Sequence, residues 1–265
     1  MSSQTTDTSI RIGDVEFPTS RPHGFGLVLD RPIGDMSEAV ANDYLHEILL
    51  TDANRESLFA LIETEGLVVC RNVHSAASTY RKVRGKSSIL KLSQAEYYHH
   101  DGCSSPTKPR VVEIRCPHQA ITRNIATAIA PLPAVIRAMV MTLPDALVTD
   151  DLVEPRERFA SATTDYPAVE TWDAIQGKVT RLARRELDAE GCRHYFRQVD
   201  LMAGAYDLPW EMGESRLMLN SHADLTRTMQ HRRAYQKPRL ESEQNGSLVK
   251  RWPAEEVGQC EACSS

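Results

Sequence analysis

Cysteine, long apolar runs and excess positive charge are all scarce in this sequence of 265 residues. Six cysteines are too few for a disulfide framework in a chain of this length, so we expect mostly free thiols in a reducing compartment. No apolar run approaches the roughly 20 residues that are needed to span a bilayer. The formal net charge of -5 gives no general attraction to nucleic acid or to an anionic membrane surface.

What is present is the composition of an ordinary soluble globular protein, with 41% hydrophobic and 25% charged residues. We expect a flexible N-terminal arm at residues 1–20, one domain with a large core at 21–254, and a tail at 255–265. The Ser/Thr-rich start lacks the regions of a signal peptide, so we expect a cytoplasmic protein. Cys260 and Cys263 in the tail have no second Cys or His pair nearby to complete a zinc site, and we expect no obligatory role for them.

Apolar periodicity predicts both helices and strands. The predicted helices cover 36–50, 54–65, 133–142 and 168–190, with Gly66 and Gly191 at helix ends, and the predicted strands cover 67–70, 111–116, 194–202 and 216–220. Helices early and in the middle of the chain, with strands and irregular loops elsewhere, favour an α+β fold. We expect a jelly-roll-like barrel with flanking helices and a helical insertion at about 146–192.

The triplet His99-His100-Asp101 is the first candidate for chemistry. On an extended segment, side chains two residues apart point the same way, so His99 and Asp101 converge while His100 turns away. An imidazole beside a carboxylate supplies two of the three ligands in the 2-His-1-carboxylate triad that binds Fe(II). Such a triplet also occurs by chance, so the interpretation requires a third ligand further along the chain.

Two C-terminal segments offer that ligand and a cosubstrate anchor. One reads His231-Arg232-Arg233-Ala234-Tyr235 followed by Pro238-Arg239, and the other reads Leu248-Val249-Lys250-Arg251-Trp252. Together with the His-x-Asp triplet and the Gly-led segment 65–73, they resemble the Fe(II)/2-oxoglutarate-dependent dioxygenases of the TauD and clavaminate-synthase-like family. The resemblance covers roughly residues 55–145 and 195–252, and it implies a double-stranded β-helix core.

Two histidines compete for the third ligand position. His231 is favoured because the family-like sequence follows it and because it lies 132 residues after His99, which leaves room for a barrel with an insertion. His222 follows an apolar strand and forms a second His-x-Asp with Asp224, but the 41 residues after Asp224 are too few to complete a barrel. Both histidines could instead be ordinary hydrogen-bonded side chains.

A cation is needed for the distal carboxylate of 2-oxoglutarate, and Arg supplies a planar, permanently charged partner. The family places this Arg on its last strand. Arg239 lies 8 residues after His231 and Arg251 lies 20 after it, and we favour Arg251 because it is on the predicted last strand. If His222 were the ligand, Arg232 or Arg233 would become the anchor.

The resemblance implies an oxygenase that uses Fe(II), 2-oxoglutarate and O2, with His99, Asp101 and His231 as catalytic metal ligands. Thr122 resembles the Thr that hydrogen-bonds the cosubstrate, although a Thr in a loop is also an ordinary turn residue. The expected reaction is hydroxylation of an unactivated C–H bond in a small polar molecule, such as an amino acid or a biosynthetic intermediate. A carboxylate at position 101 disfavours halogenation, because related halogenases open that site for chloride.

Other outcomes stay open at this point. Desaturation, cyclisation and halogenation are alternatives on the same scaffold, and a barrel that binds a metal or a small molecule without turnover is an alternative from another class. The expected partner is a small-molecule substrate, not nucleic acid or a membrane. The sequence leaves the oligomeric state open, a homodimer included.

Overall fold

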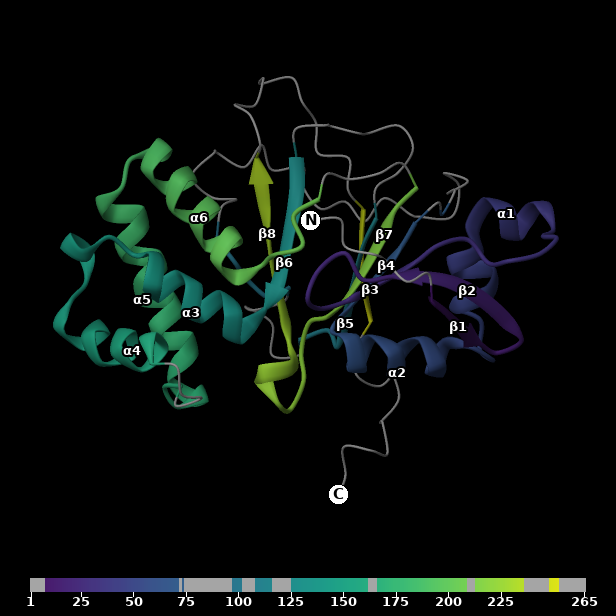
Figure 1. The fold of residues 1–265 in the computed structure, drawn as a ribbon, viewed down its shortest axis with the longest axis horizontal. Helices are drawn as coiled ribbons and strands as arrows, with labels where there is room; N and C mark the ends of the chain where they lie inside the picture. The colour runs from purple at the N-terminus through teal and green to yellow at the C-terminus, as the bar shows by residue number, and fades with distance from the viewer. Residues whose placement is uncertain are drawn as a thin grey trace.

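The computed structural model describes two β-sheets and two groups of helices (Figure 1). The described residues are 8–71, 73, 97–101, 108–115, 125–161, 166–208, 213–235 and 248–252. In this part of the chain, no helix is long and apolar enough to cross a membrane.

The larger sheet has seven strands, all antiparallel to their neighbours except the parallel pair β3–β4. In spatial order they are β1 (Thr8–Ile12), β2 (Val15–Ser20), β3 (Leu27–Leu29), β4 (Leu67–Cys70), β7 (Ser215–Leu219), β5 (Val111–Arg115) and β9 (Leu248–Trp252). The smaller sheet is the antiparallel pair β6 (Ile125–Pro131) and β8 (Met229–Tyr235).

The helices form one group on each side of the sheets. The first group packs on the larger sheet and contains α1 (Glu38–Tyr44), the π-helical turn η1 (Leu45–Leu49) and α2 (Arg55–Glu65). The second group packs on the smaller sheet and contains α3 (Leu132–Thr142), α4 (Asp150–Ala160), α5 (Trp172–Glu186) and α6 (Ala189–Ala203). Short 3-10 turns are η3 (Asp145–Leu147), η4 (Val169–Thr171) and η5 (Leu225–Arg227).

Strand β6 shows how the layers are stacked. Ala128 and Ala130 belong to the apolar cluster shared with the second helix group, whereas Ile129 belongs to the cluster between the two sheets. This alternation is the period of two that a strand imposes. The order of layers is therefore helices α3–α6, smaller sheet, larger sheet, and helices α1–α2.

Glycine 66 ends α2 as the sequence predicts. Its φ of 73° is in the region that favours Gly, and a Cβ at this position would collide with Met229 Cε at the start of β8. The turn therefore lets α2 end close to the strand that carries His231.

Mixed strands and helices agree with the predicted α+β class, and the helices of 146–192 are present. The described strands form two sheets facing each other across a shared apolar cluster, and the closed double-stranded β-helix stays a prediction.

The flexible arm at residues 1–20 was wrong for residues 8–20. They form a hairpin whose two-residue turn contains Gly13 with φ 59°, and Ile12 and Phe17 are buried under the first helix group.

The strand at 194–202 was also wrong, because these residues lie inside α6. Asp188 caps that helix by accepting a hydrogen bond from Gly191 N, and Gly204 ends it in the left-handed conformation. Gly191 is thus in the first turn of α6, and α5 ends earlier, at Leu187, where the backbone becomes extended.

Candidate metal centre

Two histidines far apart in sequence lie directly opposite each other. His99 N donates to His231 O at 3.1 Å, and His231 N donates to His99 O at 3.2 Å, which forms an isolated antiparallel bridge beside β8. Residues that exchange both backbone hydrogen bonds present their side chains on the same face. The two imidazole ring centroids are accordingly 4.4 Å apart.

Asp101 completes the cluster from the far end of the His-x-Asp triplet. Its Oδ1 lies 3.8 Å from His99 Nε2 and 3.7 Å from His231 Nε2. One ligand atom from each of the three residues lies within 4.8 Å of the others. Two ligands that bind one ion at about 2.0–2.2 Å are roughly 3–4 Å apart, so a small closure would bring all three onto one metal.

The imidazole of His99 is held in the tautomer that a metal ligand requires. Its Nδ1 lies 3.2 Å from the carbonyl oxygen of Tyr97. A carbonyl can only accept, so Nδ1 carries the proton and the lone pair of Nε2 faces Asp101. A backbone carbonyl is a usual partner for the second nitrogen of a histidine that binds a metal.

Asn220, just after β7, fixes the backbone of Asp101. Asp101 N donates to Asn220 Oδ1 at 2.8 Å, and Asn220 Nδ2 donates to Asp101 O at 3.1 Å and to Pro109 O at 2.8 Å. Asn220 is 1% exposed, so the three bonds are protected from water. The only signal for this role in the sequence is the position of Asn220 at the end of an apolar strand.

Residues that alternate with the ligands face the second helix group. Gln176 of α5 donates from Nε2 to the carbonyl of Tyr98 at 3.0 Å, and its amide exchanges hydrogen bonds with Gln230 at 2.8 and 2.9 Å. Tyr98 directly precedes His99 and Gln230 directly precedes His231. One side chain of the insertion therefore contacts both ligand-bearing segments, a role that no local pattern in the sequence indicates.

Position 100 turns away from the ligands, as the triplet predicts. His100 is buried, and its Nε2 lies 3.2 Å from Thr228 Oγ1. Burial lowers the pKa of His100 from 6.5 to about 4, so its ring is neutral near pH 7.

The alternative ligand His222 lies outside the cluster. It is in the turn that leads to η5, where Asp224 N donates to its Nδ1 at 2.9 Å and Arg227 Nη1 lies 3.2 Å from its Nε2. Partial burial, with help from Arg110 and Arg227, lowers the pKa of His222. The second His-x-Asp is thus a capped turn, in which Asp224 accepts from Thr226 N at 2.9 Å.

Arg232, the cosubstrate anchor that would have accompanied His222, points to the helices. It forms an ion pair with Asp200 of α6, and Tyr98 Oη donates to the same carboxylate at 2.7 Å. Arg251 is on β9, where its Cα is paired with that of Val112. Thr122 and Arg239 lie outside the described residues, as do the side chains of Arg233 and Arg251.

The sequence matches no protein-family model and no curated protein, whereas solved structures resemble the fold. One is from Burkholderia xenovorans and is provisionally described as an alpha-ketoglutarate dependent 2,4-D dioxygenase; it is 15% identical, with a TM-score of 0.44, over 92% of this chain and 100% of the other. A second is PvcB from Pseudomonas aeruginosa, described as an Fe, alpha-ketoglutarate dependent oxygenase, at 12% identity and a TM-score of 0.43 over 89% and 88% of the two chains. A third is a taurine dioxygenase from Burkholderia xenovorans, at 11% identity and a TM-score of 0.43 over 90% and 89%.

These structural neighbours are oxygenases. Their identities of 11–15% and TM-scores below 0.5 are too low to carry an argument about activity.

Proposed function

We propose that the protein is an Fe(II)/2-oxoglutarate-dependent oxygenase. The observation that carries the proposal is the convergence of His99, Asp101 and His231 on one face, although His231 lies 130 residues after Asp101 in the sequence. Two imidazoles and one carboxylate are the donor set of non-haem Fe(II) oxygenases, which leave the remaining metal positions open.

The exposure of the three side chains fits a catalytic metal site. The side chains of Asp101 and His231 are 11% and 9% exposed, while the side chain of His99 is 36% exposed. Asp101 and His231 are therefore shielded from solvent, whereas the cluster is accessible beside His99. A catalytic metal site needs such an opening to admit small molecules.

We assign the distal carboxylate of 2-oxoglutarate to Arg251. The register of β9 pairs this residue with Val112, whose side chain belongs to the apolar cluster between the two sheets. An Arg–carboxylate pair is charge-assisted and bidentate, which makes an Arg selective for a planar anion. Thr122 and Arg239 keep their proposed roles as cosubstrate contacts on the strength of the sequence alone.

When bound, Fe(II) with 2-oxoglutarate and O2 would supply an oxidant able to remove hydrogen from an unactivated C–H bond. The chain contributes placement: His99 offers Nε2, Asn220 holds the Asp101 backbone, and burial excludes water around His231. The carboxylate of Asp101 fills a ligand position, so we propose hydroxylation of a small polar molecule. A cytoplasmic location and a jelly-roll core belong to the same proposal.

The test is anaerobic binding of Fe(II) and 2-oxoglutarate to the full chain, followed by visible absorption. Chelation of Fe(II) by the keto acid should produce a charge-transfer band in the wild-type protein. His99→Ala, Asp101→Ala and His231→Ala should each remove that band while circular dichroism stays unchanged. On admission of O2, only the wild type should form succinate.

His222→Ala is the matched control, because it removes a histidine that lies outside the cluster. It should keep the band and the stoichiometric binding of Fe(II). Loss of the band in His222→Ala together with its retention in His231→Ala would refute the ligand assignment. Tight metal binding with no succinate would instead indicate a binding protein that performs no turnover.

A further inference from the structure

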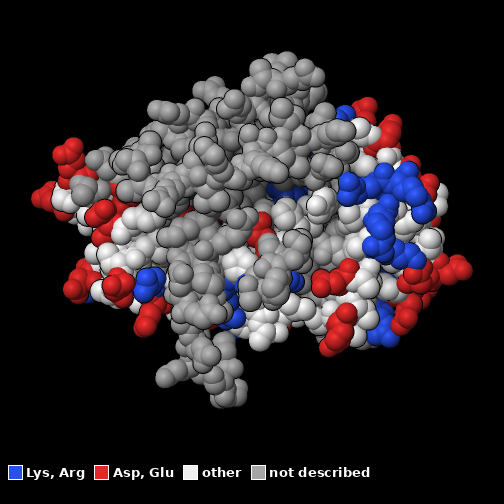
Figure 2. Space-filling model, turned by 180° about the vertical axis from the view of Figure 1, so that it is seen from behind, with Lys and Arg blue, Asp and Glu red and all other residues white. Residues whose placement is uncertain are grey.

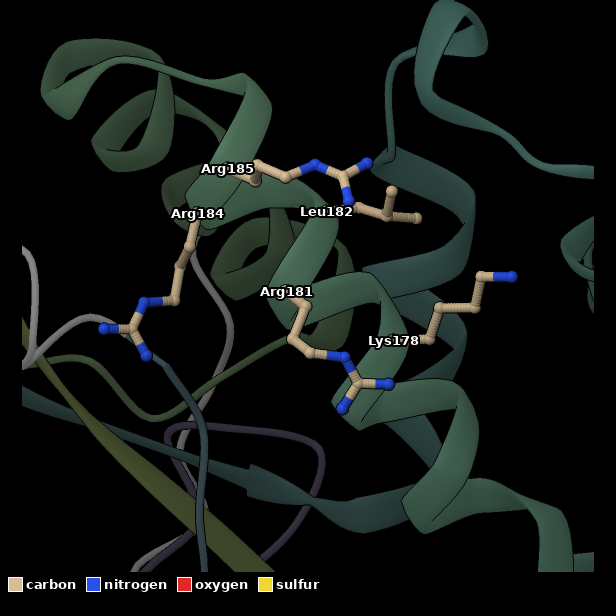
Figure 3. Close-up of a pocket in the computed structure, with 5 residues that line it drawn as sticks. All are labelled: Lys178, Arg181, Leu182, Arg184 and Arg185. Carbon is tan, nitrogen blue, oxygen red and sulfur yellow. The ribbon is translucent and has the colours of Figure 1, made fainter.

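The helices of the insertion have a charged outer face and a buried inner face. Seen from behind, Lys and Arg side chains gather on the side of the molecule that holds the insertion (Figure 2). On the outer face of α5, Arg181 and Arg184 line a shallow hollow but leave the helix in different directions, so they do not converge on one ligand (Figure 3). The inner face of α5 and α6 is apolar or aromatic apart from two buried side chains, Gln176 and Asp200. Both of these side chains contact the segments that carry the candidate metal ligands.

The pairing that brings the two histidine ligands together is short. His99 and His231 exchange two backbone hydrogen bonds in an isolated bridge. Every residue type offers the same backbone groups, so these two bonds do not select the register of the pairing. Side chains alternate along each segment, and a shift of one residue would turn His99 toward the helices and away from Asp101. The register must therefore be selected by side chains beside the bridge.

Asp200 of α6 makes the contacts that select it. In an antiparallel pairing, the residue before His99 stands opposite the residue after His231, and these residues are Tyr98 and Arg232. Tyr98 Oη donates to Asp200 Oδ1 at 2.7 Å, and Arg232 Nε donates to the same oxygen at 2.7 Å. The Cζ atom of Arg232 also lies 5.8 Å from the ring centroid of Tyr98. One helical side chain thus binds both members of the pair next to the ligands.

Burial makes this network selective. Tyr98, Asp200 and Arg232 are 2%, 4% and 4% exposed. Burial, together with the carboxylate of Asp200, raises the pKa of Tyr98 well above its ordinary value, so its Oη keeps the proton that it donates. A shifted register would separate the guanidinium and the hydroxyl from the carboxylate, and the loss of such partners is costly where water cannot replace them.

Gln176 of α5 makes the equivalent contacts on the other side of the bridge. The residue after His99 is His100, which stands opposite Gln230 in the same register. Gln230 Nε2 lies 3.4 Å from His100 Nδ1, and the amide of Gln230 is bonded to that of Gln176. The pairs on both sides of the ligands are therefore bound by the insertion.

We propose that Asp200, through Tyr98 and Arg232, is a positioning residue that sets the register of His99 against His231 and thereby the affinity of the centre for a divalent metal. The effect on metal affinity rests on the function proposed above, whereas the register can be measured without a metal. The helical insertion would accordingly take part in assembling the centre.

The experiment compares Tyr98→Phe with Tyr195→Phe, which make the same chemical change. Each removes a buried hydroxyl that donates at 2.7 Å, from Tyr98 to Asp200 and from Tyr195 of α6 to the carbonyl of Met139 in α3. The two tyrosines are 2% and 3% exposed. Only the first bond involves a residue next to a ligand. Urea midpoints of the two variants should fall by similar amounts, which separates a loss of stability from a loss of register.

Two measurements on the full chain report the register and the metal. Hydrogen exchange of the His99 and His231 amides, followed by NMR in the metal-free protein, measures how often the bridge opens. Titration with Co(II), which binds nitrogen and oxygen ligands and absorbs visible light, gives the dissociation constant and the spectrum of the site. We expect Tyr98→Phe to accelerate exchange of both amides and to weaken Co(II) binding, each about tenfold. Tyr195→Phe should change each by less than about twofold.

Asp200→Asn tests the carboxylate itself. Its Oδ1 can still accept from Tyr98, whereas an NH2 group replaces the Oδ2 that accepts from Arg232 Nη2. We expect Co(II) binding to weaken at least as much as in Tyr98→Phe. Wild-type Co(II) affinity and wild-type amide exchange in Asp200→Asn would overturn the role of Asp200.

Equal effects of Tyr98→Phe and Tyr195→Phe would also overturn the proposal, because the loss of any buried hydrogen bond among the helices would then suffice. Stoichiometric Co(II) binding with unchanged amide exchange in Tyr98→Phe would refute the register role and leave the proposed oxygenase function standing. Faster exchange in Tyr98→Phe alone, in a protein that binds no Co(II), would support the register role and refute the proposed function.

Discussion

Substitution of Asn220 by Ala should lower both the free energy of unfolding and the affinity of the candidate centre for Fe(II). The change removes the side chain that accepts from Asp101 N and donates to the carbonyls of Asp101 and Pro109. It leaves the backbone N–H of Asn220 bonded to Arg110 O, so strand β7 keeps its continuation. The perturbation is therefore centred on Asp101.

The magnitude follows from three buried hydrogen bonds. Each contributes about 0.5–1.5 kcal/mol, so the free energy of unfolding should fall by roughly 2–4 kcal/mol. The carboxylate of Asp101 would keep its chemistry and lose its fixed backbone. Removal of an outer partner of a metal ligand weakens metal binding about 10- to 100-fold, and we expect the Fe(II) dissociation constant of Asn220→Ala to rise by this factor.

Ser221→Ala provides the comparison, because Ser221 Oγ donates to the same Pro109 carbonyl at 3.0 Å and, among the described residues, makes no hydrogen bond to Asp101. It should cost about 1 kcal/mol of unfolding free energy and leave metal affinity unchanged. Urea denaturation and calorimetric titration with Fe(II) under anaerobic conditions measure the two quantities. If both variants bind Fe(II) equally well, Asn220 supports only the fold and the positioning argument is refuted.

Three further predictions test other parts of the structure. Arg251→Ala should raise the apparent KM for 2-oxoglutarate by about 30-fold, the equivalent of about 2 kcal/mol, while Arg239→Ala should change it much less; steady-state succinate formation decides between them. Asp200→Leu should lower the free energy of unfolding by about 3–5 kcal/mol, because it removes the carboxylate that pairs with the buried guanidinium of Arg232; a urea midpoint that does not move would contradict this. Phe17→Ala should cost about 3–5 kcal/mol in the same assay, whereas a residue in a flexible arm would cost nothing.

Local patterns in the sequence predict those elements whose ends carry their own signals. Gly66 marks the end of α2 and the start of β4, and both elements have the predicted positions. The hairpin of β1 and β2 also carries a local signal, a Gly13-Asp14 pair between alternating runs, but its Ser/Thr-rich start resembles a disordered arm. The stability of that hairpin comes from burial of Phe17 against the helices, which composition does not show.

Helix α6 shows how a glycine at the start of a helix can be mistaken for the glycine that ends one. Tyr195, Phe196 and Val199 fall on one helical face, yet a short run rich in aromatic and β-branched residues also fits a strand. The sequence pattern predicts that Gly191 ends the preceding helix, whereas the glycine that ends a helix here is Gly204, after α6. The helical periodicity of α6 is present in the sequence, but a helix end placed at Gly191 divides the segment at the wrong residue.

The candidate metal centre was predictable where its residues are neighbours in sequence. His99 and Asp101 follow from the period of a strand, and His231 follows from the motif that comes after it. The bridge between His99 and His231 is a long-range pairing, so spacing alone could not distinguish His231 from His222. Asn220 and Gln176 act through contacts between distant segments, and their residue types are common in any chain.

The hydrogen bonds of Gln176 limit how the helical insertion can be exchanged or shortened. Gln176 donates to the carbonyl of Tyr98, which precedes His99, and to the side chain of Gln230, which precedes His231. Helix α5 therefore connects the two segments that form the centre. A chimera that replaced α5 without a glutamine at this position would remove one hydrogen-bond donor from the carbonyl of Tyr98 and both hydrogen bonds between Gln176 and Gln230. The insertion is thus no exchangeable module, and a different insertion placed on this scaffold requires a glutamine at the position of Gln176.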